Sequence, residues 1–79
     1  NGHVNSIRYI EYLLDSFPQQ KYQDETVTRL EMNYCAEGHI TDRLHIFIDQ
    51  AEEDTCAAEI RRATDNVTVC KSRITFRKK

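Results

Sequence analysis

The sequence predicts an α+β fold in which one helix packs on one face of an antiparallel sheet. Two observations lead to it. Apolar residues recur every three or four positions up to residue 17, and from residue 30 they alternate with polar residues in four segments. Short polar stretches join these segments, which favours antiparallel neighbours over crossover connections. With 79 residues, of which 39% are hydrophobic and 30% charged, the chain resembles one small globular domain.

The helix is predicted to begin at Asn5, a suitable N-cap, and to end at Phe17, because Pro18 follows. Its apolar residues form one stripe, which consists of Val4, Ile7, Ile10, Leu13, Leu14 and Phe17. The opposite side carries the charged residues Arg8, Glu11 and Asp15. A helix of about three turns is unstable alone in water, so the apolar stripe is expected to pack on the sheet.

Residues 18–25 are predicted to form a polar connection, after which the apolar period changes from 3.6 to 2. Strands are predicted over 30–37, 43–49, 56–61 and 70–77. Turns are expected at Gly38-His39, in the acidic stretch 50–54 and at 64–66. Ala57 and Ala58 in the third strand are small, which would let the helix approach the sheet closely.

Composition argues against several classes of function. The net charge of −2 gives no indication of non-specific nucleic-acid binding. No apolar run approaches the roughly 18–20 residues that span a bilayer, so no membrane insertion is expected. Cys35, Cys56 and Cys70 lack CxxC spacing, and we interpret all three as strand residues of a cytoplasmic protein rather than disulfide partners. Neither a metal site nor a cofactor is expected.

A polar cluster runs directly into the predicted helix at the start of the chain. The carboxamide of Asn1 and the imidazole of His3 would lie beside the N–H groups of the first helical turn, where developing negative charge is stabilised. Hydrolysis of a polarised carbonyl needs an orienting donor, a base and a water. Asn1 could supply the donor and His3 the base, and the two are two residues apart. The chain therefore begins within a candidate active-site motif.

Two segments carry a resemblance to a known family. Residues 1–10 resemble the N-x-H-V-N-N/S-x-x-Y-I segment of acyl-acyl-carrier-protein (acyl-ACP) thioesterases, which are tandem hot-dog enzymes of plants and bacteria. Residues 31–37 are similar to the strand of that family that ends in Tyr-x-x-Glu. The resemblance implies a hot-dog fold, a central helix packed on a curved antiparallel sheet, with its first strand expected before Asn1. Residues 1–79 would be a single partial hot-dog domain, the second repeat of a tandem protein.

The resemblance implies hydrolysis of the fatty acyl thioester on acyl carrier protein, which releases free fatty acid. The functional asparagine, histidine and glutamate of the family fall on Asn1, His3 and Glu37. An aspartate of the family, two residues before the asparagine, falls before the first residue of this chain. The cysteine that follows the glutamate in plant members is replaced here by Gly38, and Cys35 is not its equivalent. A cysteine nucleophile is therefore not expected.

The implied partners are an acyl carrier protein and a first hot-dog repeat, and a homodimer remains open. Because carrier proteins are acidic, a basic docking surface is expected. Its candidate residues are Arg61, Arg62, Lys71, Arg73, Arg77, Lys78 and Lys79. The acyl chain would lie along the apolar stripe and the sheet face. The isolated 79 residues are expected to be inactive and marginally stable.

Two other functions stay open at the level of sequence. One is an acyl-CoA thioesterase of the hydroxybenzoyl-CoA type with a single hot-dog domain, because that family carries a related first segment. The other is a non-catalytic acyl-binding hot-dog module. In that case His3 would be a capping residue, Asn1 a chain terminus and Glu37 a solvated carboxylate. The glutamate of the second segment favours the acyl-ACP family.

Overall fold

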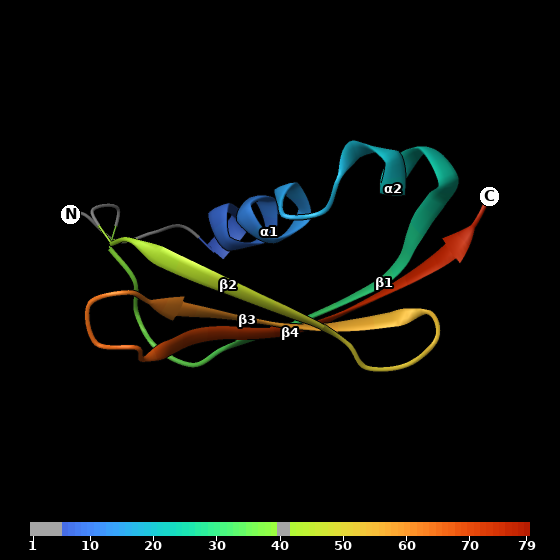
Figure 1. Cartoon of the computed structure of the whole chain (residues 1–79). Helices are drawn as coiled ribbons and strands as arrows, with labels where there is room; N and C mark the ends of the chain where they lie inside the picture. The colour runs from blue at the N-terminus through green and yellow to red at the C-terminus, as the bar shows by residue number, and fades with distance from the viewer. Residues whose placement is uncertain (1–5, 40–41) are drawn as a thin grey trace.

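The computed structural model describes residues 6–39 and 42–79. Within them the chain forms two helices and a sheet of four strands. The elements in order are α1 (Ser6–Asp15), α2 (Gln19–Asp24), β1 (Glu25–Tyr34), β2 (Leu44–Gln50), β3 (Thr55–Arg62) and β4 (Thr68–Lys78). Both helices lie on the same side of a strongly twisted sheet (Figure 1). The predicted α+β class is confirmed.

The sheet has the strand order β1-β4-β3-β2, and every neighbouring pair is antiparallel. β2, β3 and β4 follow one another through short turns, whereas β1 pairs with the last strand. Glu25 lies opposite Lys78 at one end of that pair, and Tyr34 lies opposite Cys70 at the other. A helix laid across an antiparallel sheet of this order is the hot-dog arrangement that the resemblance implied.

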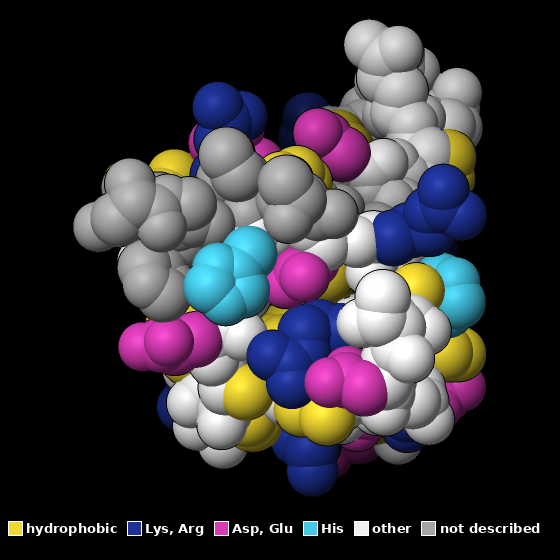
Figure 2. Space-filling view, turned by 90° about the vertical axis from the view of Figure 1, so that its left-hand side faces the viewer, with side chains coloured by type: hydrophobic (Ala, Val, Ile, Leu, Met, Phe, Trp, Pro, Cys, Tyr) yellow, Lys and Arg dark blue, Asp and Glu magenta, His cyan; other side chains and the backbone are white. Residues whose placement is uncertain are grey.

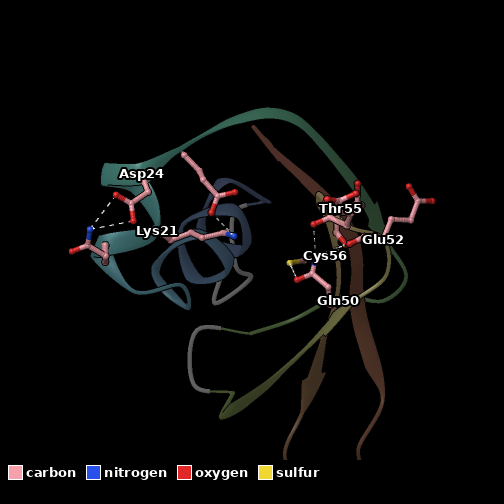
Figure 3. Close-up of polar contacts among 9 residues, drawn as sticks. Lys21, Asp24, Gln50, Glu52, Thr55 and Cys56 are labelled. Atoms are coloured by element: carbon pink, nitrogen blue, oxygen red, sulfur yellow. Dashed lines mark hydrogen bonds and ion pairs between the residues drawn. The ribbon is translucent and has the colours of Figure 1, made fainter. Parts of the chain in front are cut away.

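The chain between residues 15 and 25 differs from its prediction. α1 ends at Asp15 rather than Phe17, and the connection predicted over 18–25 contains the helix α2. Pro18 is the N-cap of α2, where its fixed φ of −65° suits the residue before a helix. Contacts four residues apart then support the helix: Gln20 Nε2 donates to both Asp24 oxygens at 3.2 Å, and Lys21 Nζ lies 2.7 Å from Glu25 Oε2 (Figure 3).

β1 begins and ends earlier than its alternating pattern predicted. It starts at Glu25, well before Leu30, and it ends at Tyr34 instead of continuing to residue 37. Cys35, interpreted from the sequence as a strand residue, therefore lies just beyond the strand and is exposed. Its backbone N–H still donates to the carbonyl of Val69 at 2.9 Å, so the chain leaves the sheet gradually.

The core lies between α1 and the sheet. Tyr9 and Leu13 are the buried residues of α1, and Ile7 of the predicted stripe is instead 59% exposed. The sheet contributes alternate residues, which are Cys56, Ala58, Ile60, Cys70, Ile74 and Phe76. Ala58 faces the helix as predicted, but Ala57 belongs to the opposite face, because neighbouring strand residues point to opposite sides.

A register shift widens the buried surface at the end of the sheet where α1 begins. Between Ile60 and Arg61 the pairing with β4 skips one residue, so Val69 and Cys70 are both buried although they are neighbours in sequence. Such a bulge bends its strand locally and can direct two side chains to one face. Tyr9 packs on this cluster together with Ile60, so the bulge accommodates the first turn of α1.

The 51–54 loop lies at the opposite end of the molecule. Gln50 Nε2 donates to the carbonyls of Glu52 at 2.6 Å and Glu53 at 3.2 Å. Cys56 Sγ donates to Gln50 Oε1 at 3.5 Å, and Figure 3 shows Gln50 and Cys56 directed toward each other. The predicted loop is confirmed over 51–54, whereas Gln50, predicted to belong to it, is the last residue of β2 and holds the loop through these contacts.

Candidate functional site

The three residues predicted for the site differ in what the structure describes of them. Asn1 and His3 lie outside the described residues. Glu37 is described and exposed, three positions beyond the end of β1. Ser6 begins α1, so the described part of the site consists of the Glu37 segment and the first turn of that helix.

A tyrosine joins these two parts. Tyr34, the last residue of β1, donates its hydroxyl hydrogen to the backbone carbonyl of Ser6 at 3.2 Å. The two residues belong to the two sequence segments that carried the resemblance. The contact brings the end of β1 against the start of α1, at the end of the molecule that Figure 2 views. Hydrophobic side chains lie there among acidic, basic and histidine side chains.

Tyr9 lies directly beneath the Glu37 segment. Its side chain is 3% exposed, and among the described residues its hydroxyl has no hydrogen-bond partner. A Cβ atom added to Gly38 would overlap this hydroxyl and come within 3.0 Å of the ring carbon Cζ. Burial raises the pKa of Tyr9, and the carboxylate of Asp42 raises it further. The phenol is therefore a neutral, close-packed support for the backbone at Gly38.

Arg62 holds the same segment from the side of β3. Its Nη1 donates to the carbonyl oxygen of Glu37 at 3.0 Å. Two further bonds fix the guanidinium on the carboxylate of Asp65, from Nε at 3.1 Å and from Nη2 at 2.9 Å. These bonds, with one from the N–H of Val67, hold the pKa of Asp65 below its usual value. The backbone position of Glu37 is thus fixed although its side chain is exposed.

Two hydrogen bonds join His39, the residue after Gly38, to Asp42. The N–H of His39 donates to Asp42 Oδ2 at 2.7 Å, and the N–H of Asp42 donates to the carbonyl of His39 at 2.9 Å. The Glu37 segment is therefore held by Arg62 before Gly38 and by Asp42 after it. An exposed carboxylate on such a fixed backbone can orient a neighbouring imidazole and stabilise its protonated form. The sequence pattern indicated Glu37, but it assigned Arg62 to carrier docking and gave no sign of this contact, which arises only through the fold.

Comparison with known proteins identifies the family. The profile of the acyl-ACP thioesterase C-terminal domain matches residues 1–78. The chain belongs to this family. An acyl-ACP thioesterase from Bacteroides thetaiotaomicron is 42% identical, with a TM-score of 0.88, over 98% of this chain and 31% of that one. A search of curated proteins found no match.

Two more distant structures confirm the hot-dog fold of this acyl-ACP thioesterase domain. The 12:0-ACP thioesterase from Umbellularia californica is 17% identical, with a TM-score of 0.80, over 100% of this chain and 30% of that one. A 1,4-dihydroxy-2-naphthoyl-CoA thioesterase from Synechocystis is 18% identical, with a TM-score of 0.74, over 95% of this chain and 68% of that one. The chain spans about a third of the length of the two acyl-ACP thioesterases.

Three of the seven basic residues predicted for carrier docking have acidic partners in this thioesterase domain. Arg61 pairs with Glu59, and hydrogen bonds from Arg61 and Thr68 lower the pKa of that carboxylate. Arg73 Nη2 lies 3.3 Å from Glu52 Oε1, and Arg62 is directed to the Glu37 segment. Each of these three arginines has an acidic partner, so their positive charge is largely balanced locally.

The predicted path for an acyl chain is not open in the described part of the domain. Between α1 and the sheet, Leu13, Ile74 and Phe76 are 0–2% exposed and fill the interior. An open depression of about 540 Å³ lies instead over the opposite sheet face. Most of its lining residues are polar or charged, among them Asn33, Glu59, Arg61, Lys71 and Arg73, but Met32, Phe47, Ala57 and Ala58 also line it. The described core between α1 and the sheet is thus closely packed, and the depression lies on the other face of the sheet.

The described residues show no other kind of centre. In the ranges 6–39 and 42–79 no group of three histidine, cysteine or acidic residues is placed to hold a metal ion. The described cysteines are all free thiols. No helix in these ranges is long and apolar enough to cross a bilayer.

Proposed function

We propose that this chain is the C-terminal hot-dog domain of an acyl-ACP thioesterase that releases free fatty acid from acyl carrier protein. The observation that supports it best is the contact between Tyr34 and Ser6, which brings the Glu37 segment to the start of α1. The contact joins the two sequence segments in which the proposed site residues lie. The family match over residues 1–78 supports the same proposal.

In the proposed reaction, water attacks the thioester carbonyl carbon. Asn1 and backbone N–H groups orient the carbonyl and stabilise the oxyanion. His3 takes a proton from the water and returns it to the departing thiolate, and Glu37 stabilises the imidazolium that forms in between. The carbon–sulfur bond breaks, which gives a fatty acid and the carrier thiol. Gly38 carries no thiol, which favours attack by water over a cysteine nucleophile, and the aspartate expected before Asn1 would serve as a base or as a nucleophile in its own right.

The whole enzyme would need more than these residues. Because the chain covers about 30% of its acyl-ACP thioesterase relatives, we propose that it packs against a first hot-dog repeat in a cytoplasmic protein. The filled interior between α1 and the sheet favours placing the acyl chain in that other repeat. An aspartate that precedes Asn1 would complete the site.

The test uses the full-length protein with long-chain acyl-ACP and the matching acyl-CoA side by side. His3→Ala and Glu37→Ala are expected to lower kcat on acyl-ACP by several orders of magnitude. Glu53→Ala, an exposed acid in the 51–54 loop at the other end of the molecule, is the control and should leave kcat unchanged. Near-normal turnover by His3→Ala would reject the assigned roles. Preference for acyl-CoA would reject the carrier substrate.

A further inference from the structure

We propose that Tyr9 and Tyr34 are positioning residues that fix the Glu37 segment against the start of α1. The inference rests on the proposed function, since it assigns a task to two residues that would not touch substrate. Tyr34 fixes the position of the start of α1 relative to the end of β1, and Tyr9 fixes how closely the backbone of Gly38 approaches α1.

The environment of Tyr34 is unusual for a residue of the core face. It is 45% exposed, so its burial contributes only part of what a core tyrosine contributes. Its hydroxyl nevertheless reaches across to the carbonyl of Ser6 at 3.2 Å. Its backbone is fixed by pairing with Cys70 in β4. The side chain therefore transmits the rigid position of the sheet to the first turn of α1.

Tyr9 supports the segment from below. Its ring packs against the rings of Tyr12 and Tyr34, whose centroids lie 6.3 Å and 6.2 Å away. Because the side chain is also 3% exposed, its hydroxyl has little freedom to move away from Gly38. Because a Cβ at Gly38 would overlap that hydroxyl, the backbone can lie this deep only with glycine there. The length of the phenol thus determines where Glu37 emerges.

Tyr22 provides a matched comparison within the same chain. Its hydroxyl also donates to a backbone carbonyl of α1, that of Leu14 near the other end of the helix. Burial raises its pKa, as it does for Tyr9. Removal of the hydroxyl bond of Tyr34 or of Tyr22 should cost stability, but the bond of Tyr22 lies near the far end of α1, away from the Glu37 segment. Tyr22→Phe is therefore the control for loss of a phenol-to-carbonyl bond.

The first experiment measures kcat, KM, the pH profile and Tm of the full-length protein on acyl-ACP. Tyr34→Phe is expected to lower kcat about tenfold, less than the roughly hundredfold that a 1 Å misplacement of a catalytic group can cost, with KM changed by less than about twofold. The acidic limb of its pH profile should shift. Tyr22→Phe should lower Tm but keep kcat and the pH profile. Equal kcat in all three proteins would overturn the proposal.

The second experiment tests the contact with Gly38. Gly38→Ala should lower kcat more than Tyr34→Phe does, because its Cβ needs the space of the Tyr9 hydroxyl. Tyr9→Phe in that background removes the overlapping atom and should restore part of the activity, since residues in contact are non-additive. Losses that simply multiply in the double variant would contradict the assigned contact.

Amide hydrogen exchange separates this inference from the proposed reaction. Peptides covering 35–39 should exchange faster in Tyr34→Phe and Gly38→Ala than in wild type, and not in Tyr22→Phe. That result supports the positioning role even if the wild-type protein fails to hydrolyse acyl-ACP, which would reject the proposed function alone. Unchanged exchange in an active enzyme would reject the positioning role alone.

Discussion

Among single residues, Arg62 shows how an exposed catalytic candidate can have a fixed backbone. The guanidinium is held by two bonds to Asp65 within one turn and donates a third to the carbonyl of Glu37. The planar guanidinium makes these bonds from three separate nitrogens, whereas the three donors of a lysine share one nitrogen and do not match a carboxylate in this two-bond geometry. The turn itself is held by Asn66, which adopts a positive φ of 61°, a conformation that asparagine tolerates.

The ionisation of Asp65 gives a prediction in pH. Its pKa is lower in the folded chain than in the unfolded one, so its contribution to stability is present above the unfolded pKa of about 4 and is lost as the pH falls through the folded value. Asp65→Asn should therefore have a lower Tm than wild type at neutral pH. The difference in Tm between the two proteins should become smaller as the pH is lowered. Thermal unfolding of the full-length protein between about pH 3 and pH 7 measures this. A gap that widens in acid would contradict it.

For the helices and strands, the alternating and 3.6-residue patterns predicted every element except α2. Short helices depend on caps and contacts four residues apart, and these fell in a polar stretch that looks like a loop. Ile7 was predicted to lie in the core because its spacing fits the apolar stripe of the helix. The sheet covers only part of that stripe, and Ile7 lies outside the covered part. The position of Glu37 beside α1 came only through the resemblance, and the bonds of Tyr34 and Arg62 join residues too distant in sequence for a local pattern to reveal.

Leu13 is the central anchor of α1, and its removal gives a prediction for the element. The side chain is 0% exposed and contacts the cluster that contains Ile74 and Phe76. Leu13→Ala should destabilise the protein by about 2–4 kcal/mol through lost burial and a residual cavity. Ile7→Ala, in the same helix but largely exposed, should cost about 0.5 kcal/mol or less. Denaturant unfolding of both variants tests the contrast, and equal losses would contradict this account of the core.

In the molecule as a whole, the sheet presents two outer strands. Within the described residues, β1 pairs only with β4 and β2 only with β3. The outer edge of each strand therefore carries backbone N–H and C=O groups that a further strand could pair with. In the proposed tandem enzyme, the strand expected before Asn1 and the other repeat would cover these edges.

The isolated 79 residues should behave accordingly. We expect them to self-associate and to lack thioesterase activity, because open strand edges favour pairing between chains and part of the proposed site precedes Asn1. Light scattering and acyl-ACP hydrolysis, measured beside the full-length protein, check both expectations. A stable monomer with the full activity of the parent would show that these residues are sufficient by themselves.

The pairing of β1 with β4 also has a consequence in time. The ribosome synthesises the chain from its first residue, yet the strand that leads to Glu37 finds its partner only when residues up to Lys78 are available. Contacts between residues so far apart in sequence form slowly, because a long loop must close first. The Glu37 segment therefore becomes fixed only once β4 has been synthesised, and in a nascent chain that stops short of β4 this segment has no sheet to hold it.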